Sequence, residues 1–158
     1  MSATPGRPAL VREKRRSRLL LDTSVWIYHF QQHPEFGAAA NRVLHDIESG
    51  VAEGLVSELS LLELTVHPLR LGRQDVADDY ELLLTEFPHL VLVPATREIL
   101  LDAAALRAAH GLRTPDAIHL ATAIHGGATA VVTNDASWCR VREVRVIALA
   151  QYRSGQKE

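Results

Sequence analysis

The sequence predicts an α/β fold, a three-layer α/β/α sandwich with a central, mostly parallel sheet. Short apolar runs alternate with longer amphipathic stretches along the chain. The runs at 19–21 and 130–132 lack the in–out alternation of a strand with one wet face, so we expect both faces of these strands to be covered. Strands that alternate with helices in this way favour a parallel sheet between two helical layers. In such folds, sites form beyond the carboxyl ends of the strands.

The individual elements follow from local signals. The strand at 19–21 ends at Asp22-Thr23-Ser24, which are N-cap residue types ahead of the apolar start of a first helix. Later in the chain, Thr114 is expected to cap a helix that has Pro115 at its first position and that ends at Gly126-Gly127. Further helices are expected at 36–49, 59–70, 73–86 and 96–110, and further strands at 55–56, 90–93, 130–132 and 144–149.

The composition is that of one soluble globular domain. Of the 158 residues, 47% are apolar, 23% charged and 5% aromatic, which allows one proper core. No run approaches the roughly 18 apolar residues of a membrane-spanning helix, and no apolar segment follows the charged N-terminus as in a secretory signal. Cys139 is the single cysteine, which excludes an internal disulfide and favours a cytoplasmic location. We expect a basic, disordered leader at 1–17, one domain at 18–150 and a C-terminal tail at 151–158.

The net charge of −2 hides an asymmetry along the chain. Residues 1–18 carry six basic side chains against one acid, Glu13, whereas residues 19–158 carry 11 basic and 18 acidic side chains. The balance is therefore +5 for the first segment and −7 for the rest. An acidic body repels RNA at long range, so RNA binding would rely on local basic groups. Two interpretations of the basic segment stay open: a solvated leader, or an arm that contacts RNA.

Four carboxylates are the candidate catalytic residues, and three of them follow strands or begin a helix. Asp22 follows the first strand directly, and Asp135 follows the strand at 130–132 after two intervening residues. Asp116 is in the first turn of the helix at Thr114, where unpaired N–H groups and the helix dipole favour an acid. Ordinary turn or cap chemistry is the alternative explanation for each of these three residues.

Glu63 is a candidate because of its place in an apolar helix. Within the expected helix at 59–70, Leu59, Leu62 and Val66 are predicted to form the core-facing stripe, with Glu63 at its border. A carboxylate there is costly unless it is paired or bound to a cation, and a snorkelling glutamate is the alternative. Four acids without a Cys/His ligand set make an oxygen-lined site suited to Mg²⁺ or Mn²⁺. Such a metal can activate a water for attack on a phosphodiester.

Four segments of the chain resemble the motifs of PIN domains. They are LLDTSV at 20–25, SELSLLEL at 57–64, RTPDAIHLATA at 113–123 and VTND at 132–135. The resemblance covers about residues 18–150, and the third motif together with the fourth is its specific part. Length and motif order are similar to those of the VapC-type toxins of bacterial toxin–antitoxin pairs. The basic leader departs from the commonest pattern and takes no role from the resemblance.

This resemblance implies a Mg²⁺- or Mn²⁺-dependent endoribonuclease that acts on RNA, is inhibited by a small antitoxin protein and usually forms homodimers. By position, Asp22, Asp116 and Asp135 would be metal ligands, and Glu63 would bind the metal directly or through water. The resemblance also implies four residues that support the site by hydrogen bonds: Thr23, Ser24, Thr133 and Asn134.

Two further residues, Arg113 and His119, belong to the third motif. Arg113 precedes the expected helix and could contact a substrate phosphate, although an ordinary loop arginine fits equally well. His119 is expected to be a core-edge histidine rather than a metal or phosphate contact.

Two alternatives to a toxin nuclease remain: a non-catalytic PIN-like module that only binds partners, and a nuclease outside a toxin–antitoxin pair. A phosphatase with Asp22 as nucleophile is disfavoured, because enzymes of the haloacid dehalogenase type need a second Asp where Ser24 stands.

Overall fold

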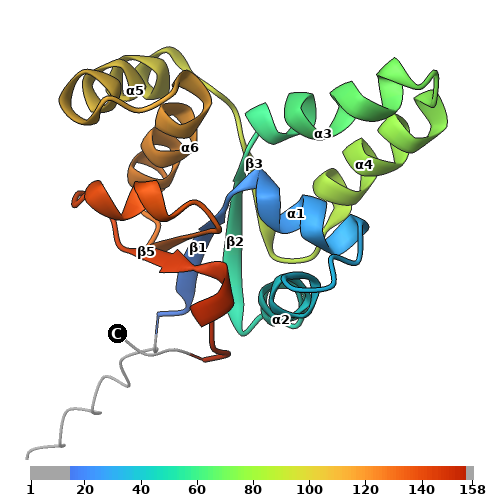
Figure 1. The fold of residues 1–158 in the computed structure, drawn as a ribbon. Helices are drawn as coiled ribbons and strands as arrows, with labels where there is room; N and C mark the ends of the chain where they lie inside the picture. The colour runs from blue at the N-terminus through green and yellow to red at the C-terminus, as the bar shows by residue number, and fades with distance from the viewer. Residues whose placement is uncertain (1–14, 156–158) are drawn as a thin grey trace, which may run out of the picture.

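The computed structural model describes residues 15–155, which are built around a five-stranded sheet (Figure 1). The strand order is β3-β2-β1-β4-β5, and every neighbouring pair is parallel. This confirms the predicted α/β sandwich with a parallel sheet. Most of the basic leader expected at 1–17 lies outside the described residues. The strands are β1 (Ser17–Leu21), β2 (Ala52–Ser57), β3 (Leu90–Val93), β4 (Ala130–Thr133) and β5 (Val146–Ala148).

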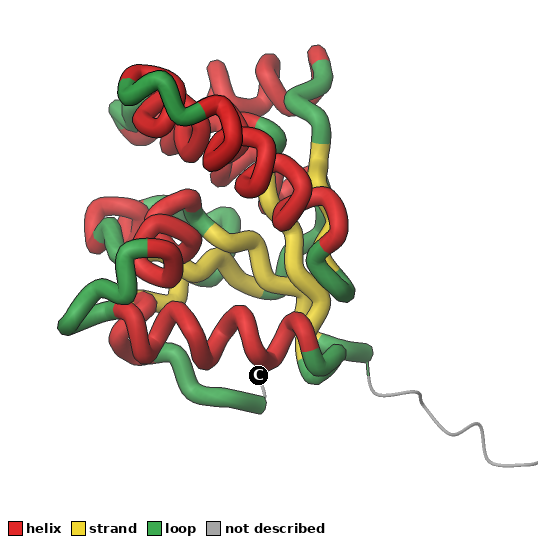
Figure 2. Tube along the Cα trace, turned by 90° about the vertical axis from the view of Figure 1, so that its right-hand side faces the viewer, coloured by secondary structure: helices red, strands yellow, loops and turns green. Residues whose placement is uncertain are grey.

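Helices cover both faces of the sheet, and the side view in Figure 2 shows the strands lying between them. Within residues 15–155 none of these helices is long and apolar enough to cross a membrane. The helices are α1 (Thr23–Phe30), α2 (Gly37–Glu48), α3 (Leu59–Arg70), α4 (Gln74–Glu86), α5 (Arg97–His110) and α6 (Thr114–His125), with short 3₁₀ helices η1 (Ala136–Arg140) and η2 (Leu149–Gln151).

Successive residues of the central strand β1 point into two separate cores. Leu20 packs with Leu55 of β2 and Val131 of β4 in the core that α5 and α6 close. Leu21 and Val132 belong to the other core, which α1, α2, α3 and α4 close. Because both faces of the inner strands are buried, their sequences are continuous apolar runs.

The strand order places the carboxyl ends of β1 and β4 side by side. The chain passes from β1 to β2 on one flank and returns to the other flank with β4. The Asp22 N–H extends this pairing, since it donates to the carbonyl oxygen of Val132 at 3.0 Å. Parallel sheets bind ligands in the crevice at such a switch in strand order. The residues that follow β1 and β4 therefore flank the expected position of a site.

Helix α3 differs from its prediction in the direction that its apolar residues face. Leu62 is 63% exposed and Val66 is 38% exposed, so the prediction that they face the core is wrong. The buried residues of α3 are instead Ser60, Leu64 and Pro68. Ser60 can be buried on this side because its hydroxyl is hydrogen-bonded to Thr23 of α1. The outer apolar face is left partly exposed.

The turn between α5 and α6 fixes where α6 begins. Gly111 ends α5 in the left-handed conformation, with φ 64°, a conformation that glycine adopts without steric penalty. Arg113 has extended backbone angles and occupies the N-cap position of α6, where Thr114 was predicted. Thr114 is instead the first helical residue. Pro115 follows in the first turn, where its missing N–H costs no helical hydrogen bond.

The last described residues are tied to α2. Tyr152 is 3% exposed, and its hydroxyl donates to Asp46 Oδ2 at 2.6 Å. Ser154 Oγ donates to the other oxygen of the same carboxylate at 2.7 Å. Burial of the phenol, together with its hydrogen bond to Asp46 and the charge of that carboxylate, raises the pKa of Tyr152 above its ordinary value.

Candidate active site

Asp22 lies directly after β1, at the N-cap position of α1. Its carboxylate is held by two hydroxyl groups that donate to the same oxygen, Oδ2. The donors are Ser24 Oγ at 2.9 Å and Thr133 Oγ1 at 2.8 Å. Because one donor lies on α1 and the other ends β4, the orientation of this carboxylate is set by the pairing of β1 with β4.

Asp135 is held next to Asp22 by the same threonine. The Asp135 N–H donates to Thr133 Oγ1 at 3.0 Å, so this hydroxyl connects the Asp22 carboxylate to the backbone of Asp135. The Asp135 carboxylate accepts a hydrogen bond from the Ser137 N–H at 2.9 Å and caps η1. Hydrogen bonding to Ser137 lowers the pKa of Asp135 more than burial raises it, and the charges of Arg113 and Arg140 lower it further.

Glu63 projects from α3 and is half-buried. Its Oε1 accepts hydrogen bonds from Thr23 Oγ1 at 2.9 Å and from His119 Nε2 at 2.6 Å. Burial alone raises the pKa of Glu63. Interactions with His119, Thr23 and Arg113 together outweigh burial, so the pKa of Glu63 lies below its usual value.

Asp116 lies in the first turn of α6 and is 8% exposed. The Arg113 guanidinium donates to it through Nε at 3.0 Å and through Nη2 at 3.4 Å. The Arg113 side chain is 77% exposed, and its charge also lowers the pKa of both Glu63 and Asp135. The positive charge of Arg113 therefore acts on three acids: it pairs directly with Asp116 and also lowers the pKa of Glu63 and of Asp135.

The structure links the predicted acids through intermediate side chains rather than by direct contact. Thr133 joins Asp22 to Asp135, and Thr23, the neighbour of Asp22, joins this pair to Glu63. Within residues 15–155, no three Asp, Glu, His or Cys side chains are close enough to hold one metal ion together. The four acids thus line one edge of the sheet as separate groups.

The donor chemistry nevertheless fits a hard divalent cation. Carboxylate oxygens are the ligands that Mg²⁺ and Mn²⁺ prefer. The hydrogen bonds to Asp22 fall on Oδ2 and those to Glu63 fall on Oε1. No hydrogen bond from residues 15–155 reaches Asp22 Oδ1 or Glu63 Oε2. Each of these carboxylates therefore keeps one oxygen available for a cation or a water.

Three of the four predicted supporting residues bond the acids directly or through the backbone. Thr23 contacts Glu63, Ser24 contacts Asp22, and Thr133 contacts Asp22 and the Asp135 N–H. Asn134 does not contact an acid, because its side-chain amide donates to the hydroxyl of Tyr28 at 3.0 Å.

His119 makes a contact with the candidate site that the sequence did not predict. It was expected to be a core-edge histidine, and it is indeed only 1% exposed, but its Nε2 contacts Glu63. The spacing of three residues from Asp116 on one helix was the available signal. That signal was incomplete, because the partner Glu63 lies 56 residues away on α3.

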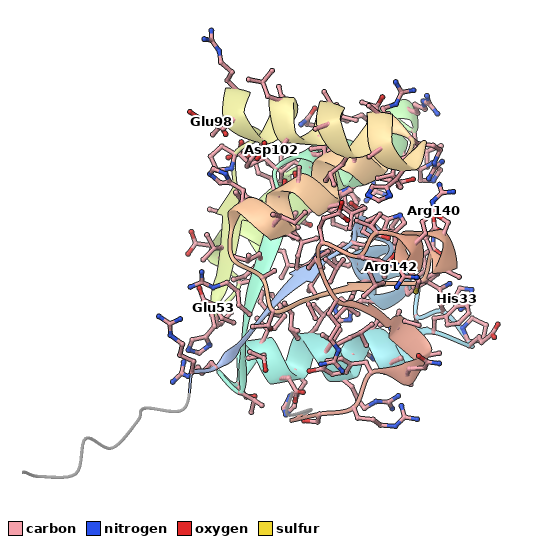
Figure 3. The ribbon with its side chains drawn as sticks, turned by 90° about the vertical axis from the view of Figure 1, so that its left-hand side faces the viewer. His33, Glu53, Glu98, Asp102, Arg140 and Arg142 are labelled. Atoms are coloured by element: carbon pink, nitrogen blue, oxygen red, sulfur yellow. The ribbon has the colours of Figure 1, made fainter. Side chains whose placement is uncertain are left out.

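Two exposed arginines follow the site residues of β4. Arg140 and Arg142 lie on the side of the molecule toward which β1 points, while Glu53 lies near the opposite end of the strands (Figure 3). Arg140 ends η1, and its charge contributes to the lowered pKa of Asp135. Basic groups are thus present at this edge of an otherwise acidic body.

One family of known proteins matches most of this chain. The family model of the PIN domain matches residues 19–144, most of the chain. The chain belongs to the PIN domain family. The match extends from β1 to the segment before β5. The four acids of the candidate site all lie within this part of the PIN domain. No curated protein has a sequence that matches this chain significantly.

Solved structures with a similar fold include a toxin–antitoxin complex and DNA-bound VapBC and FitAB. A "Toxin-antitoxin complex from Klebsiella pneumoniae" has a TM-score of 0.64 at 20% identity, over 83% of this chain and 97% of that chain. DNA-bound VapBC from Salmonella typhimurium has a TM-score of 0.65 at 18% identity, over 84% and 98%. FitAB bound to an IR36 DNA fragment has a TM-score of 0.68 at 16% identity, over 85% and 97%. At these identities the likeness establishes a shared fold.

Proposed function

We propose that this PIN-domain protein is a Mg²⁺- or Mn²⁺-dependent endoribonuclease and the toxin of a type II toxin–antitoxin pair. The observation that carries the proposal is the Thr133 hydroxyl, which bonds both the Asp22 carboxylate and the backbone N–H of Asp135 at the adjoining ends of β1 and β4. Two carboxylates held at the switch point of a parallel sheet are well placed to present oxygen ligands to a cation above the strands.

The residues proposed to hold the cation are Asp22, Asp116, Asp135 and, directly or through water, Glu63. When bound, the cation supplies a Lewis acid that activates water and offsets the charge developing on the phosphodiester. Ser24 supports this arrangement because its hydroxyl holds Oδ2 of Asp22.

Arg113 is proposed to bind a phosphate of the RNA. Its guanidinium is mostly exposed and lies within the field of three of the acids, so it can contact a backbone that approaches the cation. Its present partner, Asp116, would then be free to turn toward the metal.

The test compares RNA cleavage by wild-type protein with cleavage by Asp22→Asn, each with Mg²⁺ or Mn²⁺ and with EDTA. We expect cleavage by wild-type protein with the cation, and its loss in EDTA and in Asp22→Asn, because the variant replaces a charged ligand by a neutral amide. Asp102→Asn is the matched control, since Asp102 is an exposed acid on α5 that should not affect cleavage (Figure 3).

The outcomes separate the proposal from its alternatives. Cleavage that persists in both EDTA and Asp22→Asn would remove these acids from the mechanism. Absence of both cleavage and divalent-cation binding in the wild-type protein would favour the non-catalytic PIN module. Cleavage of DNA in preference to RNA would keep the metal chemistry and change the substrate.

A small antitoxin is the proposed partner. The proposed location is a reducing cytoplasm, where the exposed, unpaired Cys139 would remain a thiol. The support is the fold shared with chains from VapBC and FitAB complexes. A short reading frame directly upstream that encodes a DNA-binding protein is the candidate gene. Its product should co-purify with this chain and stop RNA cleavage; an isolated gene would contradict the pairing.

A homodimer is proposed through the outer face of α3. Leu62, Val66 and Leu69 are 63%, 38% and 46% exposed, and their spacing places them along one side of the helix. A second copy would bury this stripe. We expect the wild-type protein to have the mass of a dimer by light scattering and Leu62→Glu to be monomeric. Leu82→Glu, at an equally exposed leucine on α4, is the control; a monomeric wild-type protein would contradict the proposal.

A further inference from the structure

His119 connects three elements of the site. It lies on α6 one turn after Asp116, and its Nε2 lies 2.6 Å from Glu63 Oε1 on α3 and 3.4 Å from Thr23 Oγ1 on α1. The imidazole is 1% exposed and packs beside the ring of Trp138, with ring centroids 6.1 Å apart. Its position is therefore set by the core and cannot adjust freely to Glu63.

The proton positions in this contact follow from the groups around the ring. Glu63 Oε1 receives the Thr23 hydroxyl as well as the imidazole contact, so this carboxylate oxygen is the acceptor of both hydrogen bonds. His119 Nε2 must then carry the hydrogen. Nδ1 is buried and has no hydrogen-bond partner among the described residues. A hydrogen on that nitrogen would be a buried donor without an acceptor, so the geometry favours the tautomer with hydrogen on Nε2.

A chain of hydroxyl groups supplies the second donor to the same oxygen. Ser60, which is fully buried, lies with its Oγ 2.7 Å from Thr23 Oγ1. Thr23 donates to Glu63 Oε1 at 2.9 Å, so its oxygen accepts the proton of Ser60. Donors thus run from Ser60 to Thr23 to Glu63, and from His119 to Glu63.

Both donors converge on Oε1, and no hydrogen bond from residues 15–155 reaches Oε2 of Glu63. We propose that His119 is a positioning residue that, with Thr23, locks the Glu63 carboxylate so that Oε2 faces the cation or its water. This inference rests on the proposed metal-dependent function. A glutamate side chain has three rotatable bonds, and holding it by a fixed donor removes the cost of ordering it when the cation binds.

Two substitutions of His119 separate the donor from the ring. In His119→Gln the amide nitrogen is the same number of bonds from Cβ as Nε2, so it can still donate to Glu63. In His119→Asn the amide nitrogen corresponds to Nδ1 and falls short. Mn²⁺ affinity, measured by titration calorimetry without RNA, is the principal readout. We expect a loss of about 10–100-fold in His119→Asn, as for other groups that orient metal ligands, and recovery of most of it in His119→Gln.

Further measurements distinguish positioning from a general loss of structure. In cleavage assays, kcat should fall in His119→Asn while KM for RNA stays close to that of the wild-type protein, because His119 is buried away from the RNA. In a Glu63→Gln background, His119→Asn should have no further effect on Mn²⁺ affinity. Thr23→Val, which removes the other donor, is the second variant if His119→Asn does not fold; it should also weaken Mn²⁺ binding.

The outcomes separate the positioning role of His119 from the proposed function. Unchanged Mn²⁺ affinity in folded His119→Asn or Thr23→Val would overturn the positioning role, as would equal losses in His119→Gln and His119→Asn. A wild-type protein that binds no Mn²⁺ and cleaves no RNA would instead overturn the proposed function itself. Wild-type binding with the pattern of loss and recovery described above supports both.

Discussion

At the residue scale, Arg113 and a divalent cation are expected to compete for Asp116. The guanidinium holds this carboxylate through two hydrogen bonds and lowers the pKa of Glu63 and Asp135 by its charge. Removing it should free the acids for a cation but also remove a contact with RNA. We therefore expect Arg113→Ala to bind Mn²⁺ more tightly than the wild-type protein in calorimetry without RNA, and to show a higher KM for RNA in cleavage assays.

The opposite signs of these two effects make this prediction specific. Arg97→Ala is the matched control, because Arg97 is an exposed arginine at the start of α5 and should change neither quantity. Weaker Mn²⁺ binding in Arg113→Ala would show that the arginine organises the acids rather than competing for them. An unchanged KM would exclude the proposed phosphate contact.

The positions of individual site residues were predictable to different degrees. Asp22 and Asp135 could be placed near each other because parallel strands bring their carboxyl ends to one edge of the sheet. The bridge through Thr133 adds detail to that expectation. The contact between His119 and Glu63 could not be derived, since it depends on how α6 packs against α3, and no local pattern encodes the packing of two helices distant in sequence.

At the element scale, the turn from α5 into α6 is expected to depend on the backbone of Gly111. Its φ of 64° is unfavourable for residues with a Cβ, although an added Cβ would meet no atom within 4 Å. Gly111→Ala should therefore lower the free energy of unfolding by about 1 kcal/mol in urea denaturation, through backbone conformation alone. Gly111→Asn should lose less, because asparagine tolerates this conformation. A loss in Gly111→Asn larger than in Gly111→Ala would contradict this explanation.

Helix α3 shows why an apolar pattern can predict a helix and still misplace its faces. The periodicity correctly placed a helix at 59–70, with the same bounds as α3. It did not distinguish the side facing the core from an apolar side left exposed, because both Leu62 and Leu64 are leucines. The polar Ser60 can face inward because of its bond to Thr23, and that partner lies on α1. The inward side of α3 therefore follows from its tertiary contacts, which local periodicity does not encode.

At the scale of the whole molecule, the acidic balance of residues 19–158 is compatible with RNA binding, because four of the acids lie together at the candidate site on one edge of the sheet. Basic groups at the same edge, Arg113 and Arg140, lower the pKa of Asp135. RNA binding would then depend on the cation and these arginines, while the remaining surface contributes little. The sequence predicted the charge imbalance, and the fold shows which part of it belongs to the candidate site.

The contact of Tyr152 with Asp46, near the end of the described residues, predicts how stability depends on pH. Tyr152 lies beyond the matched family segment and bonds Asp46, 106 residues earlier, so no local signal predicts the contact. The folded state raises the pKa of Tyr152 above its ordinary value of 10.0. As pH rises, the unfolded state therefore loses the phenolic proton first. The stabilisation is fully present below about pH 10 and declines as pH rises toward the folded pKa.

Replacing Tyr152 should remove both the contact and this pH dependence. Tyr152→Phe leaves one oxygen of the buried Asp46 carboxylate without its donor, which should cost about 1–3 kcal/mol of unfolding free energy at pH 7. Its stability should also decline less steeply above pH 10 in urea denaturation over pH 7 to 11. Ser154→Ala, which removes the exposed donor to Asp46, should cost less and keep the alkaline decline. If Tyr152→Phe and the wild-type protein declined in parallel above pH 10, another group would control alkaline stability and Tyr152 would act through packing alone.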